Sequence, residues 1–479
     1  MRASVFLIAA GLTAVAGCSV GPDYHRPAAL PSQPLPAAFN GVEPTTNLPA
    51  WKVTQPSAHL PRGAWWKIFD DAELNRLENL AATNNQDLAA SEARFEQARA
   101  LVGIARADFF PQLSAQPGVI RQRTSVNAPQ NGRPAGAAYT YNTFLAPLEL
   151  GWELDLWGRV RRRTEGAQAR FVAAADDLES AKLSLRAEVA ADYFLLRSLE
   201  SERALVADTI KAYRRSLELT QNRRKGGIVS DLDVSQAETQ LRTTEAELPA
   251  LDLQRETLLH ALATLCGQAA TGFQLVATSL ATNTIPNVPI SLPSELLERR
   301  PDIAAAERLM SAANADVGVA KSAFYPRIFF NGLAGFQSLS ASSWFDWPSR
   351  FWAIGPSLDL PLFTGGRNRA QLALTRSAYD EIVASYRQSV LTAFEEVEDE
   401  LAAQRLLAAQ LDAQSAAFAA AQHTLDIANN RYDAGLITYL EVAIAQNAAL
   451  DRERTLVRLR GQSLMAEVGL IKALGGGWG

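Results

Sequence analysis

The chain has 479 residues, enough for two or three domains of ordinary size. Hydrophobic residues make up 48% of the chain and charged residues 20%, and the formal net charge is −5. This balance argues against a nucleic-acid-binding protein, because a surface that follows a phosphate backbone needs clustered Lys and Arg. The tightest basic cluster has four arginines within residues 159–163, and we interpret it as a solvated or headgroup-facing collar at the start of a helix.

The N-terminus predicts export. Residues 1–17 have a charged start, a short apolar run and small residues before Cys18, which is the anatomy of a signal peptide. At about 12 residues the apolar run is too short to span a bilayer. Its end resembles a bacterial lipobox, in which Cys18 is lipidated and becomes the first mature residue; the alternative is an ordinary export signal with an incidental cysteine. Cys266 would then be the one remaining thiol, so we expect no intramolecular disulfide.

A strap precedes the first helix. Residues 18–65 are rich in Pro, Ala and Asn without periodicity, and they predict an extended, lipidated N-terminal strap. The following Asp70-Asp71 pair is suited to capping a helix from about residue 72 to about residue 107.

The rest of the chain contains an internal repeat. Residues 86–113 share their pattern with residues 301–328, and residues 227–234 are echoed by residues 435–442. A duplicated unit of this length predicts two halves that pack side by side. We divide the chain at the boundaries of these copies. The first repeat is residues 66–270, an equatorial linker is 271–293, the second repeat is 294–474, and a C-terminal tail is 475–479.

Each repeat contains a very long helical pattern. Apolar residues recur at steps of three, four or seven over residues 178–217 and again over 390–425, which is a heptad-like seam. A helix over residues 159–224 would be about 100 Å long at 1.5 Å per residue, which suits a rod or a tube. Glycines at 226–227 and 435 interrupt the two patterns and predict tight helix-turn-helix tips.

Shorter alternating segments lie between the long helices. They contain Gly, Pro and aromatic residues, and their length fits a tilted transmembrane strand. The predicted strands are about 113–124, 144–156, 327–337 and 350–362. Tryptophans near their ends suit an interfacial aromatic belt. The tryptophans are Trp152, Trp157, Trp344, Trp347 and Trp352.

Four strands are too few to close a barrel, and an open sheet in lipid would leave its edges unsatisfied. Several chains must therefore contribute strands, and three would give twelve. The expected fold class is mainly α with transmembrane β. In it, a long α-helical barrel is joined to four strands per chain of a 12-stranded trimeric β-barrel, with an internal structural repeat.

Motifs spread over nearly the whole mature chain resemble one known family. They lie at residues 17–24, 65–71, 154–159, 298–303 and 355–361, and a Gly-Gly-Gly-Trp run stands near the C-terminus. Through them the chain resembles the outer-membrane factor family of tripartite efflux pumps, the TolC/OprM-like channels, in its NodT-type lipoprotein branch.

The resemblance implies a function and partners. It implies a homotrimeric, lipid-anchored channel of the outer membrane that extends into the periplasm and passively conducts drugs or other small toxic compounds. The implied partners are outer-membrane lipid, a periplasmic adaptor (membrane fusion) protein and an inner-membrane transporter of the resistance-nodulation-division (RND) type. Alternatives are a type I protein-secretion outlet or a heavy-metal efflux outlet, and outside this fold a periplasmic adaptor or a wall hydrolase.

The resemblance also implies that the helical tips form a periplasmic gate. Asp233 and Glu441 match acidic residues of the constriction in the best-known member, while Ile444 stands where that member has a second acid, which puts a double acidic ring in doubt. Carboxylates repeated around a three-fold axis would favour cations. The alternative for Asp231 and Asp233 is capping of the following helix.

Further tip residues are candidates for contacts with neighbours. Arg224, Arg431 and Tyr439 either latch neighbouring tips or are solvated last-turn residues. The candidate adaptor contacts pair small turn residues with exposed apolar ones, as knob-and-groove docking requires; their alternative is plain turn and packing chemistry. These contacts are Gly227, Leu232, Gly435 and Leu440.

The sequence does not support an enzyme. The four histidines are scattered without zinc-ligand spacing, and no Gly-rich loop follows a strand to hold phosphate. We expect no metal, no catalytic residue, no nucleic acid and no cofactor other than covalent lipid on Cys18.

Overall fold

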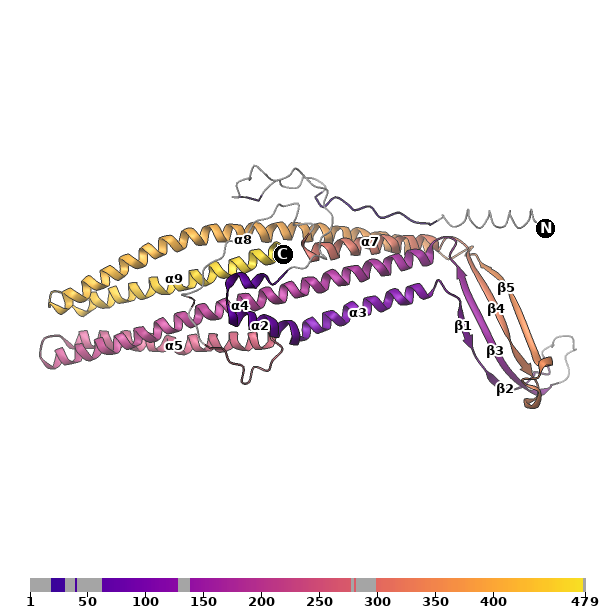
Figure 1. Ribbon diagram of the computed structural model, residues 1–479, viewed down its shortest axis with the longest axis horizontal. Helices are drawn as coiled ribbons and strands as arrows, with labels where there is room; N and C mark the ends of the chain where they lie inside the picture. Colours follow the sequence, from indigo (N-terminus) through magenta and orange to yellow (C-terminus); the bar gives the residue numbers. More distant parts are fainter. Residues whose placement is uncertain are drawn as a thin grey trace. The chain divides into compact units, whose positions relative to one another are not determined.

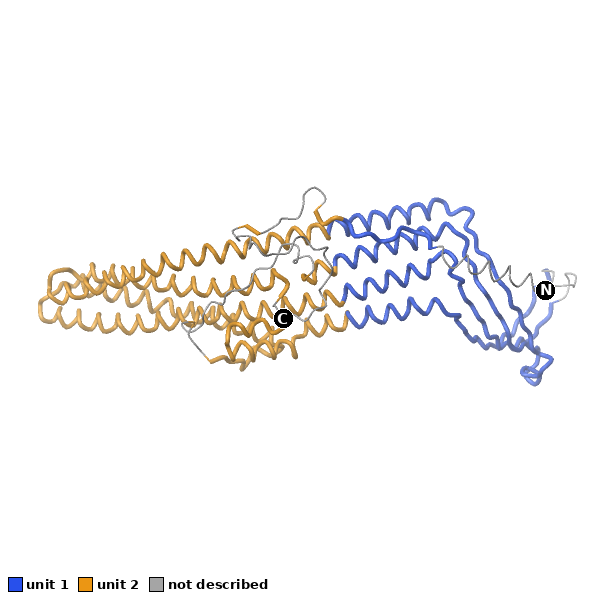
Figure 2. The backbone as a smooth tube through the Cα atoms, turned by 45° about the horizontal axis from the view of Figure 1, so that its top comes forward, with its two compact units in different colours: residues 1–27, 95–174, 306–385 blue, residues 28–94, 175–305, 386–479 orange. Residues whose placement is uncertain are grey.

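The computed structural model describes residues 19–30, 39–40, 63–127, 138–276, 280 and 299–476. The predicted signal peptide, the predicted lipidation site Cys18, most of the strap and most of the equatorial linker lie outside these described residues. The chain forms two compact units that are interleaved along the sequence (Figure 2). Unit 1 takes residues 1–27, 95–174 and 306–385, and unit 2 takes residues 28–94, 175–305 and 386–479.

The two halves contain equivalent long helices. Helix α4 (Arg159–Lys225) and helix α8 (Arg367–Asp433) have 67 residues each. Their partners α5 (Asp231–Leu265) and α9 (Tyr439–Ala473) have 35 residues each. In Figure 1, α8 runs beside α9 and α4 beside α5, as two hairpins. Among the described residues, no helix combines the length and the apolar character needed to cross a membrane.

Three further helices precede the strands, and the first predicted helix is in fact two. Helix α2 (Ala72–Asn84) follows a 3-10 turn, η1 (Trp65–Phe69), and α3 (Gln86–Ala107) has its counterpart in α7 (Pro301–Ser322). Asn85, with an extended backbone, separates α2 from α3.

The side chain of Asn85 explains the break. Its Oδ1 accepts from the Leu88 amide at 2.8 Å, and its Nδ2 donates to the Leu265 carbonyl at 2.9 Å. Such side-chain bonds compete with the helical backbone pattern.

The sheet is antiparallel throughout and lies in unit 1. Its strands are β1 (Gln112–Ala115), β2 (Gly118–Arg123), β3 (Thr140–Leu154), β4 (Arg327–Ser338) and β5 (Arg350–Asp359). Strand β3 pairs with β1, β2 and β4, and β4 pairs with β5, so β1–β2 and β5 form the two edges (Figure 1).

The first predicted strand is interrupted once. Strands β1 and β2 pair with β3 in one continuous register, in which Ala115 faces Leu148 and Gly118 faces Leu145. Pro117 falls in the gap and Pro147 lies across from it, and neither proline has an N–H for the ladder. The second strand begins at Thr140, four residues before the predicted start, and the last ends at Asp359, ahead of Pro361.

The pairing register gives the sheet two different faces. Residues that are directly opposite, and alternate residues along each strand, share a face. We define the apolar face by its large side chains, which are Leu113, Val119, Phe144, Leu148, Leu150, Trp152, Leu154, Ile328, Phe330, Phe336, Trp352, Ile354 and Leu358. The opposite, polar face carries Gln112, Ser114, Gln122, Glu149, Glu153, Asn331, Gln337 and Ser357. Its large apolar side chains are Ile120, Leu145, Phe329, Leu333 and Phe351.

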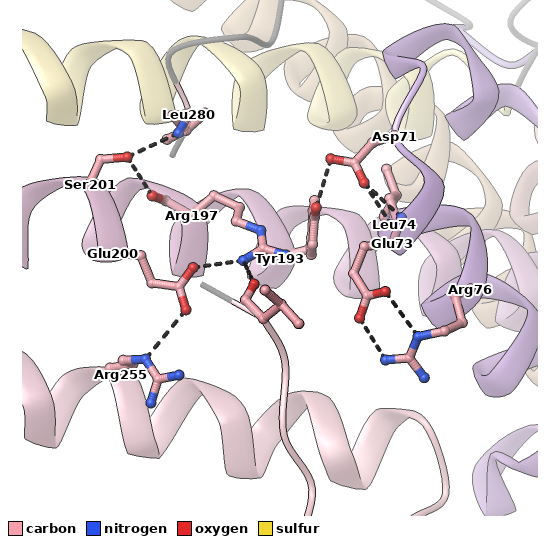
Figure 3. Close-up of polar contacts among 11 residues, drawn as sticks. Asp71, Glu73, Leu74, Arg76, Tyr193, Arg197, Glu200, Ser201, Arg255 and Leu280 are labelled. Atoms are coloured by element: carbon pink, nitrogen blue, oxygen red, sulfur yellow. Dashed lines mark hydrogen bonds and ion pairs between the residues drawn. The ribbon is translucent and has the colours of Figure 1, made fainter. Parts of the chain in front are cut away.

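In unit 2 a polar network fastens short segments to α4 (Figure 3). The Tyr193 hydroxyl donates to Asp71 at 2.6 Å, and Asp71 in turn caps α2. Arg197 donates to Glu200 at 2.7 Å and to the Val276 carbonyl at 2.6 Å. The side chains of Arg197 and Glu200 are only 5% and 4% exposed. The Tyr193 bond fixes where residue 71 meets α4, and the bond from the buried Arg197 fixes where residue 276 does, because a buried charge is costly to leave without its partners.

Candidate gate at the helical tips

The first tip, residues 222–233, joins α4 to α5. The Gly227 amide donates to the Arg224 carbonyl at 2.9 Å, and the Ile228 amide donates to the Arg223 carbonyl at 2.9 Å. Gly227 has φ +73°, in the left-handed region that favours glycine. These bonds satisfy the last carbonyls of α4 and reverse the chain.

The second tip, residues 430–441, repeats this turn between α8 and α9. The Gly435 amide donates to the Tyr432 carbonyl at 3.0 Å, and the Leu436 amide donates to the Arg431 carbonyl at 2.9 Å. Gly435 also has φ +73°. The backbone of the two tips is therefore equivalent.

The helix starts that follow the two turns differ. Ser230 is the N-cap of α5 and forms a capping box with Asp233. The Ser230 amide and hydroxyl donate to the Asp233 carboxylate at 2.9 and 2.7 Å. These bonds hold the pKa of Asp233 below its ordinary value, and the bond from the Ser230 side chain has the largest effect. At the second tip Thr438 is the N-cap of α9, without a side-chain bond, and Glu441 is exposed.

Asp231 does not cap α5. Its two carboxylate oxygens accept from Arg224 at 2.6 and 2.8 Å, and this bond keeps the pKa of Asp231 low. Arg224 therefore finds its partner within its own hairpin. Arg431 is exposed and makes no ion pair with another residue that the structure describes.

Arg223 connects the two hairpins, a role that sequence reasoning missed. It donates to Asp433 at 3.1 Å and to the Tyr432 carbonyl at 3.3 Å. Its guanidinium lies 4.5 Å from the centre of the Tyr432 ring. The sequence shows that Arg223 and Arg431 are equivalent in the repeat, but the partner of Arg223, Asp433, is 210 residues away and only the fold brings the two together.

Tyr439 is buried rather than solvated, and it begins α9 rather than ending a helix. The Ser216 hydroxyl donates to its hydroxyl at 3.3 Å, and its ring meets Tyr432 edge-on with centroids 5.8 Å apart. Burial raises the pKa of Tyr439. Of the two alternatives for Tyr439, the solvated last-turn residue is wrong, because Ser216 of α4 and Tyr432 of α8 pack on its side chain.

The predicted adaptor contacts divide into two pairs. Leu232 and Leu440, 66% and 47% exposed, both line one groove of about 460 Å³ between α5 and α9. Gly227 and Gly435 lie at the turns and do not line it. Polar side chains form most of the remaining lining, which is Ser235, Gln236, Thr239, Gln240, Thr243, Thr244, Glu247, Ala443, Asn447 and Leu450.

The basic collar is not a free cationic surface. Arg159 pairs with Glu153 at 2.6 Å, and Arg163 pairs with Asp108 at 2.7 Å. The other two arginines are also paired: Arg161 with Asp155, and Arg162 with Asp23 and Glu165. In the described part of the chain, His, Cys, Asp and Glu side chains nowhere form a group that could hold a metal ion. Cys266 is a free thiol whose burial raises its pKa to about 11.

Comparisons with known proteins match almost the whole chain. The family model described as "Outer membrane efflux protein" matches residues 77–268 and 292–476. The antibiotic efflux pump outer membrane protein ArpC of Pseudomonas putida is 33% identical over 480 residues, covering 100% of this chain and 96% of that protein. Outer membrane protein OprJ of Pseudomonas aeruginosa is 34% identical over 482 residues, covering 100% and 97%. The solved structure of the outer-membrane channel OprN has a TM-score of 0.84 at 32% identity, covering 96% of this chain and all of that chain.

Proposed function

This chain belongs to the outer membrane efflux protein family, and on that premise we propose that three copies form the exit duct of a tripartite pump for drugs or other small toxic compounds. Membership confirms the family and the fold class that the sequence predicted: a mostly helical chain with a few strands. It also makes the chain an outer-membrane efflux component rather than an adaptor or a wall hydrolase.

The two-faced sheet is the observation that carries the proposal of a shared barrel. Its apolar face suits lipid and its polar face suits a water-filled bore. The edges, β1–β2 and β5, have no partner strand among the described residues. In lipid each unpaired backbone group costs several kcal/mol, so these edges must pair with other copies. With β1 and β2 counted as one strand, three copies supply twelve strands.

We propose that Cys18 carries the lipid anchor, and the packing of the residues that follow it supports this. The Val20 amide donates to the Trp157 carbonyl at 2.9 Å, and Asp23 pairs with Arg162 at 2.8 Å. A Cβ at Gly158 would come within 2.7 Å of the Ser19 hydroxyl, so the chain lies close against the end of β3. Acyl chains on the preceding residue would therefore begin close to the end of the sheet that leads into α4.

A labelling experiment tests the anchor. Cells that express the wild type in the presence of a clickable palmitate analogue should yield a labelled band, and Cys18→Ala should abolish the label. Equal labelling of both proteins would contradict lipidation at this residue.

We propose that the tips form the gate and that Arg223 is its latch. Its contacts with Tyr432 and Asp433 hold the second hairpin to the first, so opening requires these contacts to break. Asp233 and Glu441 would add carboxylates at the constriction. The low pKa of Asp233 keeps it ionised, so capping α5 and lining an acidic ring are compatible roles.

We propose that the groove between α5 and α9 receives a helical hairpin of the periplasmic adaptor, which links the duct to an inner-membrane transporter. Leu232 and Leu440 supply exposed apolar contacts, and the hydroxyl and amide side chains supply hydrogen bonds. An amphipathic helix that binds in a groove makes both apolar contacts and hydrogen bonds of this kind.

Complementation of an efflux-deficient strain tests the function. The wild type together with its cognate adaptor and transporter should restore growth on an antibiotic, and the Leu232→Asp/Leu440→Asp variant should lose this rescue. The matched control is Leu253→Asp, an exposed leucine of α5 outside the groove, which should keep it. Failure of the wild type to restore export would contradict the proposed function.

A further inference from the structure

The arginines at the two ends of the sheet differ in their partners. At the end nearest α4, each arginine of the collar has a carboxylate partner. At the loop end, Arg121, Arg123 and Arg350 are exposed, and none of them pairs with a carboxylate among the described residues. These arginines are therefore not neutralised by an ion pair with any residue that the structure describes.

The sequence around the loop end contains almost no acidic residue. Residues 116–143 and 334–353 together hold four arginines and a single acid, Asp346. Asp346 forms no ion pair with Arg121 or Arg123 in the described part of the chain. Their partner must come from outside this part of the chain.

The register places these arginines at the boundary of the apolar face. Val119 faces Phe144, and the next alternate pairs in the same direction are Arg121 with Asn142 and Arg123 with Thr140. Alternation puts both arginines on the apolar face, directly beyond its last apolar pair. Arg350, opposite Phe336, lies on the same face at the loop end of β5.

Aromatic rings mark the same boundary. Trp344 meets Phe144 with ring centroids 5.3 Å apart and stacks on Phe345 at 4.9 Å. The Arg350 guanidinium lies 4.1 Å from the centre of the Trp347 ring. Aromatic side chains gather where hydrocarbon gives way to headgroups, so the arginines next to them lie at headgroup depth.

We propose that Arg121, Arg123 and Arg350 bind the phosphate groups of the anionic glycolipid, lipid A, in the outer leaflet. A guanidinium matches phosphate with two parallel N–H donors, and unpaired cations on a lipid-facing surface favour an anionic headgroup. The orientation rests on the proposed function, which leaves the helices in the periplasm and the loop end outside.

A lipid-binding titration of the purified full chain in detergent tests the proposal. Tryptophan fluorescence is followed on adding diphosphoryl lipid A or the same lipid without phosphates. The wild type should prefer the phosphorylated form by about a hundredfold, because each of the three arginines contributes roughly 1 kcal/mol near an anionic surface and about 1.4 kcal/mol is a factor of ten. Arg121→Gln/Arg123→Gln should remove most of this preference, and Arg121→Lys/Arg123→Lys should keep part of it.

The control is Arg376→Gln/Arg405→Gln, which removes two exposed arginines of α8 that have no ion-pair partner among the described residues and should keep the preference. Equal wild-type binding of both lipids, a retained preference in the Gln variant, or full competition by inorganic phosphate would each overturn the proposal. Bilayer conductance of the same wild-type preparation separates the lipid-binding proposal from the proposed channel function. A conducting channel without lipid preference contradicts this inference alone, whereas no conductance contradicts the proposed function.

Discussion

The two tips have the same backbone conformation but different side-chain contacts. Each has a glycine at φ +73° and joins a helix of 67 residues to one of 35. The first tip is tied to itself through the Ser230–Asp233 capping box and the Arg224–Asp231 pair. The second tip has no side-chain cap, and Asp433 and the Tyr432 carbonyl accept from Arg223 of the first hairpin.

This difference shows how a duplicated unit acquires two roles. Turn geometry depends on the backbone and survives in both copies, because glycine alone meets its requirement easily. Side-chain contacts are free to diverge. The first hairpin is locally self-sufficient, and the second depends on the first for its position, so we expect the second to be the one that moves.

Breaking the contact between the tips should have the largest effect. Arg223→Ala removes an ion pair, a bond to a carbonyl and a cation–π contact, so the turn of the second hairpin is held less firmly to the first. We expect a severalfold rise in single-channel conductance in planar bilayers. Arg431→Ala, at the equivalent but unpaired position, should stay near the wild-type value; a similar rise in both variants would contradict the latch.

Removing the cap should affect the first tip alone. Ser230→Ala is expected to destabilise the start of α5 by about 1 kcal/mol, the usual cost of losing an N-cap side chain. Hydrogen exchange of amides near residue 233 should speed up accordingly. Thr438→Ala should change exchange at the start of α9 much less, because Thr438 makes no side-chain cap bond. Equal effects at both sites would remove the distinction.

Acidification should loosen the first tip before the second. The pKa values of Asp231 and Asp233 lie below the ordinary 3.8, so their contribution to stability is complete above that value and is lost as the pH falls through the folded-state pKa. Exchange at the first tip, corrected for the intrinsic pH dependence, should therefore rise below about pH 4 more than at the second. A larger rise at the second tip would reverse the comparison.

The smallest effect is expected from the exposed acid of the second tip. Glu441→Gln should lower the preference for cations modestly, since it removes one carboxylate per copy without breaking a described contact. The reversal potential in a salt gradient measures this. The control is Asp426→Asn, which removes an exposed acid of α8 instead. An equal shift of the reversal potential in both variants would indicate a general charge effect.

The sequence predicted what depends on periodicity and on glycine. The lengths of α4 and α8, the two turns and the alternation of the strands follow from apolar spacing and from Gly227 and Gly435. It missed features decided by single polar or proline residues. Asn85 splits a helix through a contact with Leu265, far away in sequence, and the first strand breaks at residues 116–117, where Pro117 and, opposite Gln116, Pro147 both lack a backbone N–H.

Tertiary contacts explain the errors at the tips. Arg223 and Arg224 are adjacent and chemically identical, and only the position of Asp433 on another helix decides which of them joins the hairpins. Tyr439 has a polar group and stands beside a turn, which favours exposure, yet it is buried because two long helices pack over it. The local sequence pattern predicts neither the Arg223–Asp433 contact nor the burial of Tyr439.

The mass of the purified particle tests the central claim most directly. The account requires the edge strands of each sheet to pair with those of other copies. For material that conducts ions in bilayers, light scattering in detergent should therefore give the protein mass of three chains. A conducting particle with the protein mass of one chain would contradict the account.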